Sequence, residues 1–135
     1  GVQISRDYDP SIPDIQVAPD QLIQAVLNIV RNAMQAVGKD GRILLRTRTQ
    51  RLFTIGNTTH KLVARIDIVD NGPGIAPEFQ DQIFYPMVTT RAQGSGIGLS
   101  IAQTLVSQHG GLVECTSQPG NTTFTISLPL EERDE

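Results

Sequence analysis

Two asparagines, Asn28 and Asn32, lie one helical turn apart in a segment whose apolar residues recur at helical spacing. Their amide oxygens are short, neutral ligands that suit a hard cation such as Mg²⁺, which keeps its waters and is otherwise held by substrate phosphates. Gln21, Gln24 and Gln35 continue the polar stripe. A solvated helix face is therefore the competing interpretation, and it is favoured when the stripe is taken alone.

A second candidate begins at Asp70, where a strand-like run ends, and continues through Gly72, Gly74 and Ile75. A carboxylate at this place can accept a hydrogen bond from an exocyclic amine. The two glycines remove side chains, so a flat ring can approach the backbone. A plain turn explains the same residues, because they include nearly every turn former, and it is favoured without further support.

A third candidate is the run Gly94, Gly96, Gly98 and Leu99, which leads directly into a helical pattern. Glycines before a helix N-terminus expose backbone N–H groups and the positive end of the helix dipole, which suits phosphate. The run is not a dinucleotide fingerprint, because no strand precedes it. It is not a P-loop either, because no Gly-Lys-Ser/Thr follows. Alone it is a weak signal.

Thr89, Thr90 and Arg91 stand just before that glycine run. They add two hydroxyl groups and one fixed positive charge that could reach the same phosphates. An exposed arginine is more often simply solvated.

Several elements must position these residues. We expect a strand at 2–6, a helix at 20–37, strands at 42–49 and 62–70 joined by a turn-rich segment at 53–58, a short helix at 77–84, a mobile loop at 85–97, a helix at 98–108, and a hairpin of 112–117 with 122–128. This order predicts an α+β fold, a two-layer sandwich with about three helices on one face of a largely antiparallel mixed sheet.

Two of these elements carry finer expectations. The helix at 20–37 is apolar over most of its circumference, so we expect it to be largely buried. The strand at 62–70 alternates, with Arg65 and Asp67 on the side opposite its apolar residues.

Composition limits the function classes. The chain has 135 residues and a net charge of -3, which fits one domain over 1–135 and argues against a nucleic-acid or membrane-surface binder. No apolar run approaches the roughly 18 to 20 residues needed to cross a bilayer, and no signal-peptide pattern is present. Cys115 cannot form an internal disulfide, and His60 and His109 lack metal-ligand spacing. We expect a cytoplasmic, monomeric domain with an N-terminal strand and connection at 1–19 and an acidic tail at 131–135.

Taken together and in this order, the motifs resemble the nucleotide-binding domain of sensor histidine kinases, in the ATPase group that includes gyrase B, Hsp90 and MutL. Residues 28–33 resemble the family's N box, 70–74 its D-x-G-x-G box, 84–86 its F box and 94–98 its second glycine box. The resemblance covers residues 20–128. It implies the family's Bergerat-type ATP-binding fold.

The resemblance implies ATP and Mg²⁺ as cofactors. Asn32 would be the principal Mg²⁺ ligand and, with Arg91, a catalytic residue. Asp70 would read the adenine amino group, and residues 85–97 would form the ATP lid. The nucleotide-binding set would be Asn28, Asn32, Asp70, Gly72, Gly74, Ile75, Thr89, Thr90, Arg91, Gly94, Gly96, Gly98 and Leu99.

Within the family, residues 28–37, 84–91 and 107–111 are most similar to nitrogen-regulation sensor kinases. This similarity implies a nitrogen-type response regulator and a PII-type signal protein as partners. Met87 stands where many members have a second Phe, and Gln35 where many have a basic residue. Arg91 replaces the lysine often found in the lid, which keeps the charge but offers a forked donor.

A kinase and an ATPase of this group differ at one position. The ATPases carry a Glu one turn before the Mg²⁺ asparagine, where this chain has Asn28. An amide cannot act as a general base, so bound ATP should persist until a better nucleophile arrives. An ATPase of the same fold, or an anti-sigma-factor type serine kinase, remains the alternative, as does a module that only holds nucleotide.

The phosphoacceptor is expected outside this chain. Neither His60 nor His109 lies on a long amphipathic helix with an acidic residue directly after it, which is the pattern of the family's acceptor. His109 fits a capping role at the negative end of a helix instead. The acceptor would then be on a histidine-bearing dimerisation domain of the same protein.

Overall fold

The computed structural model describes residues 1–15, 17–80 and 98–130 of the chain. In these residues five strands form one mixed sheet in the order β1-β2-β3-β5-β4, with β1 parallel to β2 and every other neighbouring pair antiparallel. The strands are β1 (Gln3–Asp7), β2 (Arg42–Ile55), β3 (Thr58–Asp70), β4 (Leu112–Gln118) and β5 (Asn121–Pro129). The expected α+β class and the N-terminal edge strand are confirmed.

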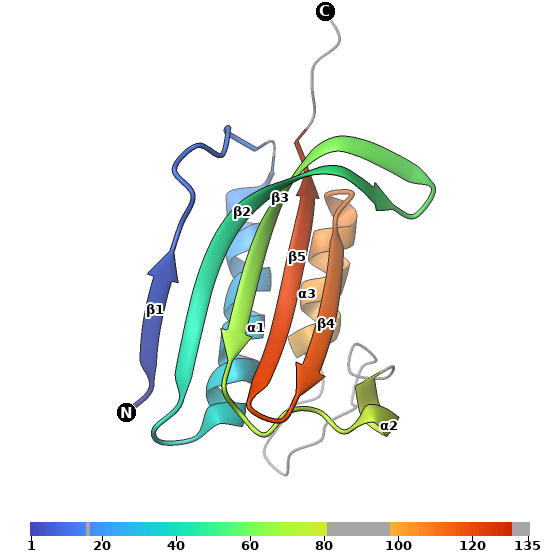
Figure 1. Ribbon diagram of the computed structural model, residues 1–135. Coiled ribbons are helices and arrows are strands. Elements are labelled where there is room, and N and C mark those ends of the chain that lie inside the picture. Colours follow the sequence, from blue (N-terminus) through green and yellow to red (C-terminus); the bar gives the residue numbers. More distant parts are fainter. Residues whose placement is uncertain (16, 81–97, 131–135) are drawn as a thin grey trace, which may run out of the picture.

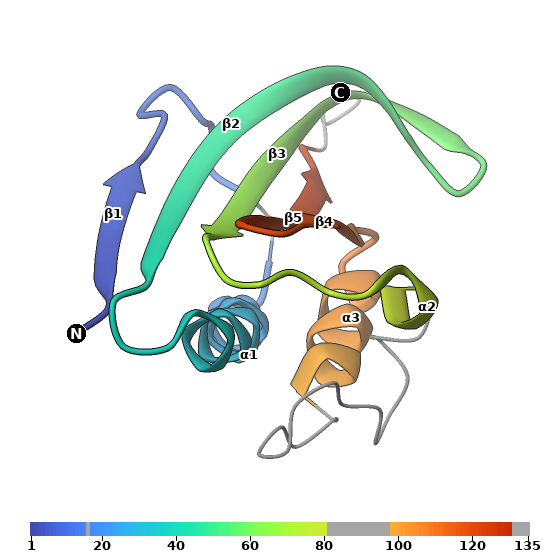
Figure 2. The same cartoon turned by 60° about the horizontal axis from the view of Figure 1, so that its bottom comes forward.

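The helices form the second layer. Helix α1 (Pro19–Val37) and helix α3 (Gly98–Gln108) lie side by side against one face of the sheet (Figures 1 and 2). The third expected helix is described only as α2 (Pro77–Gln80), a single turn near the end of β4. No helix among the described residues has the length and apolar character needed to cross a membrane.

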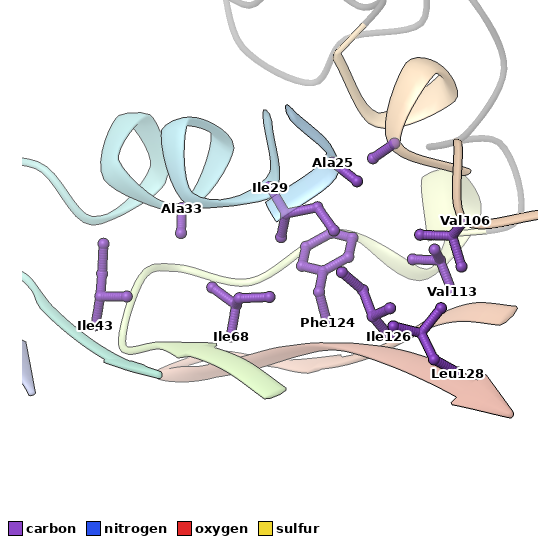
Figure 3. Packing of buried hydrophobic residues seen from close by; sticks show 11 residues of the cluster. Ala25, Ile29, Ala33, Ile43, Ile68, Val106, Val113, Phe124, Ile126 and Leu128 are labelled. Carbon is purple, nitrogen blue, oxygen red and sulfur yellow. The ribbon is translucent and has the colours of Figure 1, made fainter. Parts of the chain in front are cut away.

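The hydrophobic core fills the space between α1, α3 and the sheet (Figure 3). Phe124 of β5 is completely buried and faces Ile29 of α1, and burying a side chain of this size stabilises the fold by about 1.5 to 3 kcal/mol. The other fully or nearly fully buried apolar residues of this cluster are Ala25, Ala33, Ile43, Ile68, Ala102, Val106, Val113, Ile126 and Leu128.

One prediction about α1 is wrong. Its inner side is buried, but Ile23, Leu27 and Met34 on its outer side are 55%, 44% and 44% exposed. A helix packed on a sheet buries only the side that meets the sheet and its neighbouring helix. Among the residues that the structure describes, nothing covers the opposite side.

The connection expected at 53–58 is also largely wrong, because β2 and β3 continue through it. Phe53 pairs with His60 and Ile55 with Thr58, so the turn shrinks to Gly56 and Asn57. Aromatic and β-branched residues favour strands, whereas Gly56 has a φ of 60°, a conformation that favours glycine. The two strands therefore form one long hairpin that reaches beyond the sheet (Figure 1).

The uncovered face of β3 carries Arg65 and Asp67, as the alternation predicts, but Asp67 is only 1% exposed. Its carboxylate accepts hydrogen bonds from Arg46 Nε at 3.0 Å, Arg65 Nη2 at 3.2 Å and Thr125 Oγ1 at 2.8 Å. These side chains cover the carboxylate and satisfy it. A polar side chain on the outward face is thus buried by its own cross-strand neighbours.

Candidate functional site

The site begins with Asp70, the last residue of β3. Asp70 pairs with Ile43 of β2 and Thr122 of β5. Since Ile43 belongs to the core, this row of residues faces the helices. Asp70 is 3% exposed, and its Oδ1 accepts the N–H of Gly72 at 2.9 Å. A carboxylate is therefore buried at the end of the sheet, on the side of the two long helices.

The first part of the following loop is tied to β2 and to the β4–β5 turn. Asn71 N–H donates to Arg42 O at 3.2 Å, and Asn71 Oδ1 accepts Arg42 N–H at 2.8 Å. Gly120 N–H donates to Gly72 O at 2.8 Å. These bonds fix the course of the chain immediately after Asp70.

The second part of the loop is held by side chains. Ile75 N–H donates to Ser117 Oγ at 2.8 Å, and Ser117 Oγ lies 2.7 Å from Thr122 Oγ1. Gln80 Nε2 donates to Ile75 O at 2.8 Å. The loop from 71 to 75 is therefore anchored at Asn71, Gly72 and Ile75, mainly to elements that are distant in sequence.

Close packing explains why both loop positions, 72 and 74, are glycine in this structure. A Cβ on Gly72 would lie 3.1 Å from Ala36 O, at the end of α1. Gly74 has a φ of +89°, and a Cβ there would lie 2.9 Å from Gln118 O. A larger residue at Gly74 would have to displace backbone. The predicted role of these glycines in leaving room for a ring remains a prediction.

Helix α1 adds a polar flank. Asn28 is 8% exposed, and its Oδ1 accepts a hydrogen bond from Gln24 Nε2 at 3.2 Å. Asn32, one turn further, is half-buried, whereas Gln24 and Gln35 are exposed. The residues of the polar stripe therefore fall into two groups. The glutamines are solvated, as the plain interpretation holds, and the asparagines turn inward.

Helix α3 brings its N-terminus to the same end of the molecule. Gly98 begins the helix as predicted, and it points toward the end of the molecule at which β3 ends and the β4–β5 turn lies (Figure 1). Leu99 and Ile75 both pack against the core cluster. The structure thus brings Asp70, its loop, the α1 flank and the start of α3 toward one end of the helix-covered face.

The remaining predicted site residues lie outside the described part of the chain. This holds for the loop expected at 85–97 and for the F-box segment at 84–86. The individual residues are Thr89, Thr90, Arg91, Gly94 and Gly96.

The donor set fits a magnesium ion that is held mainly by its substrate. In the described residues no three His, Cys, Asp or Glu side chains gather as a metal site. Asn28 and Asn32 offer amide oxygens from adjacent turns of α1. Mg²⁺ commonly takes one or two protein oxygens together with phosphates and water, so this sparse set is compatible with it.

Cys115 reports on the electrostatics of the site. It packs against the core, as expected for a sheet residue. Burial, with a further contribution from the negative charge of Asp70, raises the pKa of its thiol to about 12. The thiol is therefore protonated and unreactive near neutral pH.

The two histidines have structural roles in the described chain. His109 Nδ1 donates to Leu105 O at 2.8 Å, and its Nε2 accepts Ala18 N–H at 3.0 Å. One imidazole ring thus caps the end of α3 and ties it to Ala18, the N-cap residue of α1, which confirms the expected capping role. His60 is half-buried within β3, opposite Phe53.

Sequence reasoning missed Ser117, Thr122 and Gln80 as supports of the site. Each is an ordinary polar residue in a segment expected to be strand or short helix. Only the register of β4 with β5, which places Ser117 opposite Thr122, shows that the two hydroxyls meet. Alternation within the hairpin could have placed them on the core-facing side, but not beside the loop.

Comparisons with known proteins agree with this geometry. A family model described as histidine kinase-, DNA gyrase B-, and HSP90-like ATPase matches residues 17–132. Among curated proteins, the sensory histidine kinase/phosphatase NtrB of Escherichia coli O157:H7 is 53% identical over 97% of this chain, and that of Proteus hauseri is 55% identical over 96%. The chain spans only 38% of the length of either relative.

Solved structures show the same arrangement. The catalytic domain of histidine kinase ThkA superposes with a TM-score of 0.79 at 25% identity, covering 96% of this chain and 79% of that one. Full-length ShkA in complex with AMPPNP gives a TM-score of 0.78 at 27% identity, covering 100% of this chain and 27% of that one. The fold is therefore that of histidine kinase catalytic domains.

Proposed function

This chain belongs to the family of histidine kinase-, DNA gyrase B- and HSP90-like ATPases, and we propose that it is the ATP-binding catalytic domain of a sensor histidine kinase. It would transfer the γ-phosphoryl group of ATP to a histidine on a separate dimerisation domain. The bond from phosphorus to the β,γ-bridging oxygen breaks, a phosphorus–nitrogen bond to the imidazole forms, and ADP leaves. The observation that carries the proposal is the gathering of Asp70, the asparagine flank of α1 and the start of α3 at one end of the helix-covered face.

Asp70 is the proposed adenine reader. Its buried carboxylate would accept a hydrogen bond from the exocyclic amino group of adenine. Guanine presents a carbonyl oxygen at that position, which a carboxylate repels. Gly72, Gly74 and Ile75 would form the wall along the ring.

Asn32 is the proposed Mg²⁺ ligand, with Asn28 beside the phosphates. The ion would neutralise charge on the phosphates. The start of α3, with Gly98 and Leu99, offers backbone N–H groups and a helix dipole to the same phosphates. The proposal adds phosphate contacts from five residues outside the described part of the chain, namely Thr89, Thr90, Arg91, Gly94 and Gly96, within a lid over 85–97.

Slow hydrolysis is part of the proposal. Asn28 occupies the place of the family's general base, and its Oδ1 already accepts a hydrogen bond from Gln24. An amide cannot take a proton from water, so bound ATP would persist. Both ring nitrogens of His109 are engaged, and His60 belongs to a strand, so neither supplies the acceptor. A same-fold ATPase or serine kinase would instead show steady ATP hydrolysis by the isolated chain.

The wider assignment rests on the curated relatives. Because the NtrB proteins of Escherichia coli O157:H7 and Proteus hauseri are each more than half identical to this chain, we include a nitrogen-responsive two-component system in the proposal. It would have a nitrogen-type response regulator, a PII-type signal protein and a place in the cytoplasm. Single-domain organisation over 1–135 is likewise proposed.

Titration calorimetry of the chain with ATP tests the proposal. One ATP should bind per chain, more tightly with Mg²⁺ than with EDTA, while the rate of phosphate release stays near the background. Failure of the folded chain to bind ATP would refute the proposed function. Rapid steady release of phosphate would favour the ATPase alternative.

A further inference from the structure

We propose that Ser117 is a positioning residue that sets the adenine selectivity of this site, because its hydroxyl joins the loop after β3 to the Thr122 hydroxyl beside Asp70. The proposal rests on the proposed function. Ser117 itself is not expected to touch the nucleotide. It lies at the end of β4, on an element that no sequence motif assigns to the site.

The hydrogen-bond inventory gives Ser117 two tasks. A serine hydroxyl has one proton to donate and two lone pairs to accept. One lone pair accepts Ile75 N–H at 2.8 Å, and the contact of 2.7 Å with Thr122 Oγ1 takes either the proton or the second lone pair. Removal of this one oxygen would leave both Ile75 N–H and Thr122 Oγ1 without that partner.

The position of Thr122 explains why this contact matters for the base. Thr122 lies directly opposite Asp70 in the β3–β5 ladder, and both side chains face the helices. Residues in such a pair have Cβ atoms about 4.5 to 5.5 Å apart. Thr122 is 4% exposed and Asp70 is 3% exposed, so water competes poorly for either group. If Ser117 donates to Thr122, the proton of the Thr122 hydroxyl stays available to a further acceptor on this face of the sheet.

The loop side of the contact is equally specific. Gly74 passes against the backbone of Gln118, where even a Cβ would come within 2.9 Å of the Gln118 carbonyl oxygen. Gln80 Nε2 donates to Ile75 O at 2.8 Å and lies 3.4 Å from Ser117 O. Ser117 therefore holds the N–H of Ile75, and Gln80 holds its carbonyl oxygen. Together these two hydrogen bonds set the distance between the loop and Asp70.

Selectivity follows from this distance. A site built to hydrogen-bond one polar edge rejects an analogue because its own polar groups would be left unpaired. A loosened loop would admit water and let the base shift. The affinity for ATP would then fall, and the cost of binding GTP, whose edge leaves polar groups of the site unpaired, would also fall. Ser117 therefore acts on the ratio of the two affinities, whereas a purely structural residue acts on the amount of folded protein.

The test compares Ser117→Ala with Ser127→Ala, its matched control. Ser127 is a serine in the same hairpin, completely buried where Ser117 is half-buried, and its Oγ has no hydrogen-bond partner in the described chain. ATP and GTP affinities are measured by calorimetry on fully folded samples, as judged by circular dichroism. Ser117→Ala should lower the affinity for ATP about 5- to 10-fold and lower the ratio of ATP affinity to GTP affinity. Ser127→Ala should leave the ratio unchanged.

Two further variants guard against misfolding. Ser117→Thr keeps the hydroxyl and should restore the ratio. Ser117→Cys keeps the volume but bonds weakly, so it should fall between the serine and alanine proteins. If the unaltered chain binds ATP but the ratio of ATP to GTP affinity is unchanged in both Ser117→Ala and Ser117→Cys, the proposed role of Ser117 is wrong. If the unaltered chain does not bind ATP, the proposed function itself fails.

Discussion

Two carboxylates lie three residues apart on β3, on opposite faces of the sheet, and both are almost completely buried. Asp67 is 1% exposed and Asp70 is 3% exposed. Asp67 faces away from the helices and receives hydrogen bonds from two guanidinium groups and Thr125. Asp70 faces the helices beside a glycine loop and two hydroxyl-bearing residues.

Burial alone therefore does not identify a binding carboxylate. The charge of Asp67 is matched by the positively charged Arg46 and Arg65, an arrangement that stabilises the sheet and offers nothing to a ligand. Asp70 instead accepts the backbone N–H of Gly72, in a loop that approaches Ala36 and Gln118 closely because Gly72 and Gly74 lack side chains. One strand therefore carries a structural aspartate and a proposed binding aspartate.

Asp67→Asn should have the largest effect, and the effect should be on stability. The amide removes the charge that two arginines share, and we expect the free energy of unfolding to fall by about 2 to 3 kcal/mol. The arginines are one-third exposed, so water offsets part of the loss. Urea denaturation measures it. The folded fraction should bind ATP normally, and a loss of ATP affinity would erase the distinction between the two carboxylates.

Asp70→Asn makes the same change on the other face and should act on binding. We expect ATP affinity to fall about 10- to 30-fold, in line with the loss of a hydrogen bond to a charged group. Stability should change by less than about 1 kcal/mol, because an asparagine Oδ1 can still accept Gly72 N–H. Competition with a fluorescent nucleotide measures the affinity. An equal loss for GTP would contradict the role of Asp70 as the adenine reader.

The smallest effect concerns the Cys115 thiol. Since its pKa is raised to about 12, alkylation of the native protein at pH 8 should be at least about a hundredfold slower than in the unfolded chain. Asp70→Asn removes the secondary cause of the raised pKa and should speed the reaction about two- to threefold. Asp67→Asn should not speed the alkylation, provided the protein stays folded. Equal rates in both variants would show that the charge of Asp70 does not reach Cys115.

The same raised pKa has a defined sign for stability. The protonated thiol contributes its full stabilisation below the pKa of an unfolded cysteine, about 8.5. That contribution is lost as the pH rises through the folded value of about 12.

The fold could be predicted from spacing along the chain to a large extent. Helical periodicity placed α1 and α3, and the Pro119-Gly120 turn placed the β4–β5 hairpin. The length of the β2–β3 hairpin and the exposed side of α1 were missed. Both depend on what each segment packs against, which local propensity does not encode.

The site could be predicted in part. Asp70 stands at the end of a strand and Asn28 lies on an inward flank of α1, as the sequence indicated, although their roles remain predictions. The burial of Asp67 and the contact of Ser117 with Thr122 could not be predicted. They arise from the register of β3 with its neighbours and of β4 with β5.

The proposed kinase activity can be measured as phosphoryl transfer in trans. The chain is mixed with an isolated histidine-bearing dimerisation domain of a relative and γ-labelled ATP, and acid-labile label on the histidine is followed over time. We expect Mg²⁺-dependent labelling of the histidine, which is strongly reduced by Asp70→Asn and retained by folded Asp67→Asn. A chain that binds ATP but leaves the histidine unlabelled would not be the proposed phosphoryl donor.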